Sequence, residues 1–151
     1  MEIEKSFNIA STKRRLSSFV IDDLIVTTFF IIIFFEQLSK LFGNITVIDD
    51  RLILNINIFI SANIWILLSI KVLYHAILVS QNGMTIGKYI MKIKVIDLDT
   101  SNIPTLQKSL IRAVVRMPSE SVLYLGFALA FFTPLKQTLH DKLSSCIVVD
   151  A

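Results

Sequence analysis

Two long runs of hydrophobic residues dominate the chain, and each is long enough to cross a membrane as a helix. The first covers residues 16–35 and the second covers residues 56–79. The hydrocarbon core of a bilayer is about 30 Å thick and a helix rises about 1.5 Å per residue, so about 20 apolar residues suffice. The pattern therefore predicts an α-helical membrane protein with two transmembrane helices.

A third apolar run, residues 121–135, is too short for an ordinary span. Pro118, with Arg116 and Glu120 on either side of it, makes an extension towards the N-terminus unfavourable. We expect a third membrane-embedded helix here. Its length leaves open whether this helix is re-entrant, interfacial or spanning.

The segment between the second and third runs, residues 80–118, follows a different pattern. Residues 92–97 alternate charged and apolar side chains and predict a short strand. Residues 106–116 place apolar side chains at helical spacing and predict a basic amphipathic helix, which suits an anionic membrane surface. Its basic residues fall on another side: Lys108, Arg112 and Arg116. Arg112 and Arg116 are one turn apart and would either reach Asp141 or Asp22 or contact lipid phosphates. The tail, residues 146–150, is again strand-like and would pair with residues 92–97 if both lie on one side of the membrane.

Composition agrees with a membrane protein. The 151 residues are 54% hydrophobic and 18% charged, with a mean hydropathy of +0.68, whereas soluble domains are about 45–50% apolar and about 25% charged. We interpret residues 1–151 as a single domain. One cysteine, Cys146, excludes an internal disulfide and cannot form a zinc site alone. We expect no cofactor, no metal and no nucleic-acid partner, because a net charge of +3 is weak evidence for nucleic acid.

The distribution of charge predicts the orientation. Residues 1–15 carry four basic and two acidic side chains, residues 36–52 carry two and three, and residues 80–118 carry six and two. Basic residues collect on the cytoplasmic side, so we expect the N-terminus and residues 80–118 inside and residues 36–52 outside. Lys136 and Lys142 mildly favour a cytoplasmic tail as well, which favours a re-entrant or interfacial third element.

Charged residues inside the two long runs are the candidate chemistry. Asp22 and Asp23 lie in the first run, and Lys71 and His75 share a face of the second. Arg15 is two helical turns before Asp22 and lies on the same face. We hypothesise that Asp22 or Asp23 pairs with Lys71. Intramembrane acids often mark ion or proton pathways, but a buried ion pair can also only lock helices together.

No enzyme motif stands out, so we expect neither an enzyme nor catalytic residues. Residues 83–88 lack the spacing and the Ser or Thr of a phosphate-binding loop. Residues 97–102 resemble the start of a calcium loop, but no glycine occupies the sixth position and Lys108 stands where the bidentate Glu belongs.

Taken together, the chain resembles the RDD family of small bacterial membrane proteins, which is named for one arginine and two aspartates. Four segments carry the resemblance, in the family's order: residues 14–24, 83–100, 109–116 and 139–149. The resemblance maps the three signature positions to Arg15, Asp22 and Asp141. Asp23 is a neighbour of the signature.

The resemblance implies a multi-pass protein of the bacterial cytoplasmic (inner) membrane and leaves two functions open. Some members behave like sodium–proton antiporters. A small cation and a proton would then exchange at Asp22. The charges of Arg15 and Lys71 would tune the pKa of Asp22, and Asp141 would act as a cytoplasmic gate or helix anchor. Other members look like accessory subunits, in which the cytoplasmic segment binds a partner. Either function implies contacts with anionic lipid and a homo-oligomer or a membrane-protein partner. Supporting site residues would be Asp23, Lys71, His75, Gly83, Gly87, Lys88, Arg112 and Arg116.

Overall fold

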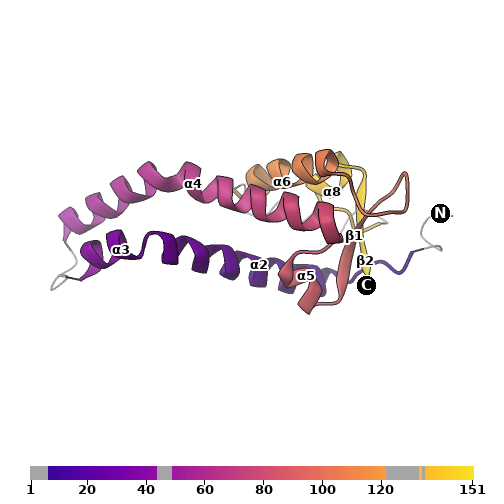
Figure 1. Cartoon of the computed structure of the whole chain (residues 1–151), viewed down its shortest axis with the longest axis horizontal. Coiled ribbons are helices and arrows are strands. Elements are labelled where there is room, and N and C mark those ends of the chain that lie inside the picture. The colour runs from indigo at the N-terminus through magenta and orange to yellow at the C-terminus, as the bar shows by residue number, and fades with distance from the viewer. Residues whose placement is uncertain (1–6, 44–48, 122–132, 134) are drawn as a thin grey trace.

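The computed structural model describes residues 7–43, 49–121, 133 and 135–151. The described part is mostly helical, with one small sheet (Figure 1). In chain order its elements are α2 (Thr12–Ile33), α3 (Phe35–Phe42), α4 (Asp50–Asn82), α5 (Ile86–Ile90), β1 (Ile93–Asp97), α6 (Leu106–Ser121), α8 (Leu139–Leu143) and β2 (Cys146–Asp150).

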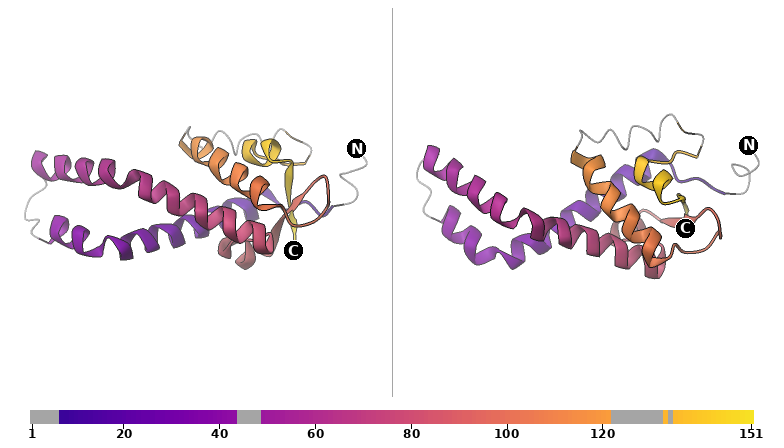
Figure 2. Two further views of the ribbon diagram at one scale, coloured as in Figure 1. Left: turned by 45° about the horizontal axis from the view of Figure 1, so that its top comes forward. Right: turned by 90° about the horizontal axis from the view of Figure 1, so that it is seen from above.

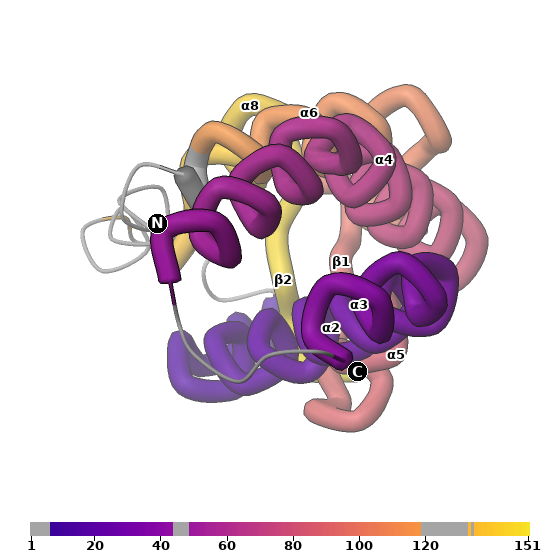
Figure 3. The backbone as a smooth tube through the Cα atoms, turned by 90° about the vertical axis from the view of Figure 1, so that its left-hand side faces the viewer, coloured from indigo at the N-terminus to yellow at the C-terminus, as the bar shows by residue number. Residues whose placement is uncertain are grey.

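Two long helical arms set the shape of the molecule. α2 continued by α3 forms one arm and α4 forms the other, and both run along the long axis (Figures 1 and 2). The short elements α5, β1, α8 and β2 gather at one end, and α6 lies along α4 there. Viewed along the long axis, the two arms stand on opposite sides of the two strands (Figure 3).

The first arm starts and ends differently from the apolar run at residues 16–35. Ser11 caps α2 by accepting a hydrogen bond from the Arg14 backbone N–H, so a polar first turn precedes the apolar run. α2 ends at Ile33, because Phe34 leaves the helical conformation before α3 begins. The rings of Phe30 and Phe34 pack against Phe59 of the other arm, with centroids 6.2 and 5.8 Å apart.

The second arm is longer than the predicted residues 56–79. Asp49 caps α4 by accepting from the Leu52 N–H at 2.9 Å, and the helix continues to Asn82. Gly83 then ends α4 in a left-handed conformation, which glycine adopts without strain. Hydrophobicity alone misses such polar end turns, because caps stabilise them rather than apolar contacts.

Both arms expose many of their large apolar side chains. α2 and α4 are each long and apolar enough to cross a membrane, by length and composition. On α2, Arg15 and Asp22 are 6% and 0% exposed, whereas Leu24 and Ile32 are 62% and 64% exposed. Because a core helix of a water-soluble protein has the opposite pattern, this distribution favours lipid around both arms.

α6 follows the same inverted pattern, so its arginines face inward rather than an anionic membrane surface, and Arg112 pairs with Asp141 as one of the two alternatives predicted. Arg112 and Arg116 are buried. The exposed side of the helix is instead apolar: Leu106, Leu110, Ile111 and Val114. The arginines turn inward because carboxylate, imidazole and aromatic groups of other elements contact them there.

The two predicted strand segments pair with each other. β1 and β2 are antiparallel, with Val95 opposite Val148, and Ile9 adds an isolated bridge to Val149. One face of this sheet packs into a small apolar core against the end of α4: Ala10, Val79, Ile93, Val95, Cys146 and Val148. The predicted third membrane element, residues 121–135, lies almost wholly outside the described residues.

A buried charged cluster at one end of the helices

One stripe of α2 provides the base of the candidate site. Its buried residues follow the spacing i, i+3, i+4, i+7 and i+11: Arg15, Ser18, Phe19, Asp22 and Val26. This spacing places all five side chains on one face of the helix. The stripe therefore turns a cation and a carboxylate towards the short elements that gather at this end.

Asp22 is fully buried and accepts four hydrogen bonds or ion-pair contacts. Its Oδ1 atom accepts from the Tyr74 hydroxyl and from the Gly87 backbone N–H, each at 2.8 Å. Its Oδ2 atom accepts from the Thr85 hydroxyl at 2.6 Å and lies 3.3 Å from Nζ of Lys88. Three segments that are distant in sequence thus meet at one carboxylate.

Two glycines allow α5 to reach Asp22. Gly83 has φ +68°, and a Cβ there would also lie 2.9 Å from the Val95 carbonyl oxygen. Gly87 packs directly on α2, where a Cβ would lie 2.3 Å from the Ser18 carbonyl oxygen and 2.8 Å from Oδ1 of Asp22. The missing side chain at Gly87 lets its N–H approach the carboxylate.

Lys88 is the cation that accompanies Asp22. Its ammonium group also donates to the Thr85 hydroxyl at 3.1 Å, so Thr85 bridges the two charges. Burial lowers the pKa of Lys88 to about 8, with Arg116 and Arg112 adding to the effect and Asp22 opposing it. An ammonium group with this pKa is mostly protonated at neutral pH and loses its proton about one to two pH units higher.

Lys71 pairs with Asp23, which was one of the two partners hypothesised from the sequence. This pair is less enclosed than the Asp22 pair, because the Asp23 side chain is 40% exposed. The expectation that Arg15 and Lys71 tune Asp22 is not what the structure shows. Lys88 takes that place, because the turn at Gly83 folds α5 back onto α2.

Arg15 and Asp141 belong to a second, neighbouring network. Asp141 lies 3.5 Å from Nη1 of Arg15, and its Oδ1 atom accepts from Nε and Nη2 of Arg112 at 2.8 and 2.6 Å. Arg15 also donates to three backbone carbonyl oxygens, those of Ala10, Lys136 and Val148. Arg15 therefore ties α2 to β2 and to the segment before α8.

Asp141 also organises its own short helix. It occupies the third position of α8 and forms a reciprocal capping box with Thr138. Burial alone would raise the pKa of Asp141, but the positive charges of Arg112 and Arg15 hold it below its usual range. Burial lowers the pKa of the adjacent His140 to about 3, so this imidazole is neutral at physiological pH.

His75 and Arg116 connect the networks to α4. Nη1 of Arg116 lies 3.2 Å from Nδ1 of His75. The guanidinium group of Arg116 also stacks over the ring of Phe19, 4.8 Å from its centroid. His75, one of the supporting site residues predicted, is buried at this end of α4.

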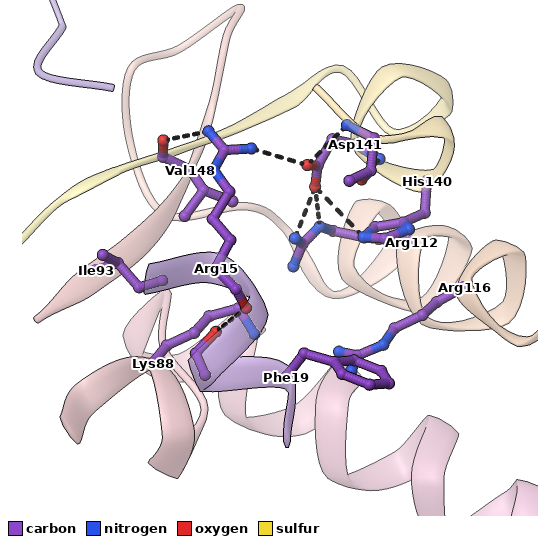
Figure 4. A pocket seen from close by; sticks show the side chains of 11 residues that line it. Arg15, Phe19, Lys88, Ile93, Arg112, Arg116, His140, Asp141 and Val148 are labelled. Carbon is purple, nitrogen blue, oxygen red and sulfur yellow. Dashed lines mark hydrogen bonds and ion pairs between the residues drawn. The ribbon is translucent and has the colours of Figure 1, made fainter. Parts of the chain in front are cut away.

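A small cavity lies between these groups (Figure 4). Arg15, Lys88, Arg112 and Arg116 line it together with Asp141. Their charged groups come from four elements, α2, α5, α6 and α8, and lie around one space in the close view. The cavity is therefore the place where both networks meet.

In residues 97–102, which resemble the start of a calcium-binding loop, the two carboxylates pair with a lysine. Nζ of Lys108 lies 2.7 Å from Asp97 and 2.6 Å from Asp99. Hydrogen bonds to both carboxylates raise the pKa of Lys108. Within the described residues, no group of three or more His, Cys, Asp or Glu side chains could hold a metal ion.

Tyr74 and Thr85 are site residues that the sequence did not reveal. Each contributes a hydroxyl group to Asp22, but hydroxyl side chains are common and neither lies in a distinctive motif. One signal was present: Tyr74 lies inside the second apolar run rather than at its edge, where membrane tyrosines usually concentrate.

The fold and the site together define a membrane protein with apolar helix faces outside and a charged cluster inside. The chain belongs to the RDD family, whose family model matches residues 9–145. No curated protein matches the chain in a sequence search, and no solved structure matches it either.

Proposed function

We propose that this protein is a membrane transporter that exchanges a small cation for a proton at Asp22. The observation that supports it most is the buried pair of Asp22 and Lys88, bridged by Thr85. Asp22 lies ten residues after the first residue of α2, which is about 15 Å along the helix axis. A buried acid at such a depth commonly serves ion or proton movement.

The exchange step conserves the charge of the buried pair. In the resting state the Asp22 carboxylate faces the Lys88 ammonium. A cation that binds to the carboxylate displaces the ammonium, and Lys88 then releases one proton to solvent. One positive charge enters and one leaves, so the step avoids burying a net charge, which would be very unfavourable.

The groups around Asp22 suit a hard cation. The hydroxyl oxygens of Tyr74 and Thr85 each lie within hydrogen-bond distance of the Asp22 carboxylate, and hard cations prefer such oxygen ligands. Lys88 supplies the proton because its pKa of about 8 allows deprotonation close to physiological pH. We assign no step to Lys71.

We further propose that the charged end faces the cytoplasm of a bacterial inner membrane and that the protein acts as an oligomer. Basic residues concentrate in residues 1–15 and 80–118, as expected of cytoplasmic segments. The pairing of β1 with β2 supports the same side for residues 92–97 and the tail. Two helices seldom enclose a transport path alone, and their exposed apolar sides are available to further copies.

An accessory or scaffold function is the second candidate. The observation that favours it is the complete set of donors around Asp22: both carboxylate oxygens already have two partners each. In this function, the Asp22 carboxylate would bind no ion and would serve to hold α2, α4 and α5 together. The cytoplasmic segment would then bind a partner protein.

A proteoliposome assay separates these candidates. Sodium, lithium or potassium is added outside vesicles that contain a pH-sensitive dye, and the pH change is compared among wild type, Asp22→Asn and Asp23→Asn. We expect exchange in wild type, loss to background in Asp22→Asn, and most of the rate in Asp23→Asn, because Asp23 pairs with Lys71 at a more exposed position.

Circular dichroism and size-exclusion chromatography serve as the folding control for each variant. Normal exchange by a well-folded Asp22→Asn protein would contradict the assignment of the site. Absence of exchange in all folded proteins, with each of the three cations, would favour the scaffold candidate.

A further inference from the structure

The cavity between α2, α5, α6 and α8 is lined by more cationic than acidic side chains. Three of the cationic side chains that line it are Arg15, Lys88 and Arg112. Their carboxylate partners are Asp141 and Asp22. Three cations thus meet two carboxylates, even when Arg116, which contacts His75 and Phe19, is left out of the count. His140 adds no charge at physiological pH.

The same cavity has more hydrogen-bond donors than acceptors. Nε and Nη2 of Arg112 both contact the Asp141 carboxylate. Within the described residues, no hydrogen-bond acceptor is found for Nη1 of Arg112. The Lys88 ammonium has three N–H groups and donates to two oxygens, those of Asp22 and Thr85. The Thr138 hydroxyl accepts from the Asp141 N–H, and its own hydrogen has no acceptor among the described residues.

We propose that this cavity is a binding site for the oxygens of a phosphate-type anion, held by Arg112, Lys88 and Thr138. A guanidinium group, an ammonium group and a hydroxyl are typical ligands of such oxyanions, which offer acceptors alone. Anion binding here does not require cation exchange at Asp22, although both sites share Lys88.

Size and position narrow the class of ligand. The cavity measures about 30 Å³, and about 10–15 Å³ of such space accommodates one water-sized atom. It therefore accepts the leading oxygens of a phosphate group rather than a bulky organic molecule. Arg15 and Phe19 place it beside the first two turns of α2, about 5–10 Å from the start of that helix. Both free phosphate and a phospholipid headgroup can supply the same chemistry at that level.

Lys88 would link the two sites. An anion beside its ammonium group stabilises the protonated form, and this is the form that occupies Asp22 before exchange. By linkage, anion binding should weaken cation binding, and cation binding should weaken anion binding by the same factor.

The test compares Arg112→Lys with Arg14→Lys in the full chain. Arg112→Lys keeps the charge next to Asp141 but removes the Nη1 donor. Arg14→Lys makes the same chemical change outside the cavity, where Arg14 pairs with Asp150 and is 43% exposed. Inorganic phosphate is titrated by calorimetry into each protein in phosphatidylcholine nanodiscs, at constant ionic strength.

We expect phosphate to bind wild type and Arg14→Lys equally, and Arg112→Lys about tenfold more weakly, because one charge-assisted hydrogen bond is lost. The second arm measures phosphatidylglycerol retained by the purified proteins by native mass spectrometry. Retention that depends on Arg112 but not on Arg14, without phosphate binding, would identify the lipid headgroup as the source of the anion. Binding in neither arm, or equal loss in both variants, would overturn the proposal.

If Arg112→Lys does not fold, wild type alone provides the test. Chemical acetylation of Lys88 is followed by mass spectrometry with and without inorganic phosphate or phosphatidylglycerol, and exposed Lys94 of β1 serves as the reference. Protection of Lys88 relative to Lys94 by either ligand supports the site. Unchanged relative rates with both ligands would contradict it.

Discussion

At the scale of single residues, Gly87 shows how closely the site is packed. Its backbone N–H donates to Asp22 at 2.8 Å, and its Cα lies against the α2 backbone at Ser18. No other residue type leaves room for this contact. The chemistry at Asp22 thus depends on a residue that has no side chain.

We predict that Gly87→Ala weakens both stability and exchange. The added methyl group would lie 2.3 Å from the Ser18 carbonyl oxygen, so α5 must move away from α2 and lose its contact with Asp22. Overpacking of this kind typically costs about 1–3 kcal/mol. Thermal unfolding and the proteoliposome assay check both effects, with Tyr89→Ala as the control because that α5 side chain is 72% exposed. Unchanged stability in Gly87→Ala would contradict the packing described.

The sequence predicted several of these residues but not all of their partners. Asp22 stands out as an acid in an apolar run, and Lys71 as a cation at a similar depth. The partner of Asp22, Lys88, is more than 60 residues away in the chain, and only the turn at Gly83 brings it back. The pattern of apolar and polar residues along the chain does not predict a contact between residues so far apart in sequence.

At the scale of elements, α8 is a short helix whose stability rests on buried ionisable groups. Its five residues include His140 and Asp141, which are 3% and 1% exposed. The Thr138 capping box and the contacts with Arg112 and Arg15 hold this helix against α6 and α2. Protonation of a buried group here should therefore change the stability of the folded protein.

We predict that acidification between about pH 6.5 and pH 4 destabilises wild type through His140. Its pKa is about 3 in the folded protein and 6.5 when unperturbed, so the unfolded chain binds more protons in this window. The stabilisation that comes from keeping His140 neutral is fully present above pH 6.5 and is lost progressively as the pH falls towards 3. The stabilisation from ionised Asp141 stays constant in this window and is lost only at lower pH, because the folded pKa of Asp141 lies below its usual value.

Unfolding in denaturant across this pH range, for wild type and His140→Gln, measures the effect. The difference between the two proteins isolates His140 from other titrating groups. We expect the free energy of unfolding of His140→Gln to change less with pH. Parallel pH profiles would show that His140 is not held neutral.

The helices and strands were predictable to different degrees. Apolar runs at residues 16–35 and 56–79 indicate both long helices, and their ends shift because Ser11 and Asp49 add capped polar turns. Helical spacing identifies α6, but not which side faces inward. That side is decided by Asp141 and His75 of other elements, so it could not be read from residues 106–116 alone.

At the scale of the whole molecule, apolar side chains lie outside and the buried charged side chains gather at one end. Leucine, isoleucine and phenylalanine side chains cover the outside of both arms, and the charged groups lie between α2, α5, α6 and α8. The sheet and α8 lie at this same end (Figure 1). Such an arrangement shields the Asp22 pair from the lipid that would surround the arms.

The most direct test of cation–proton exchange is the pH dependence of cation affinity, measured with the purified full chain by sodium-binding calorimetry from pH 6 to pH 10. Because one proton leaves Lys88 for each cation bound, we predict that affinity rises about tenfold per pH unit at low pH. The rise should level off above the Lys88 pKa of about 8. Cation affinity that does not change with pH, or the absence of binding at every pH, would contradict exchange at Asp22.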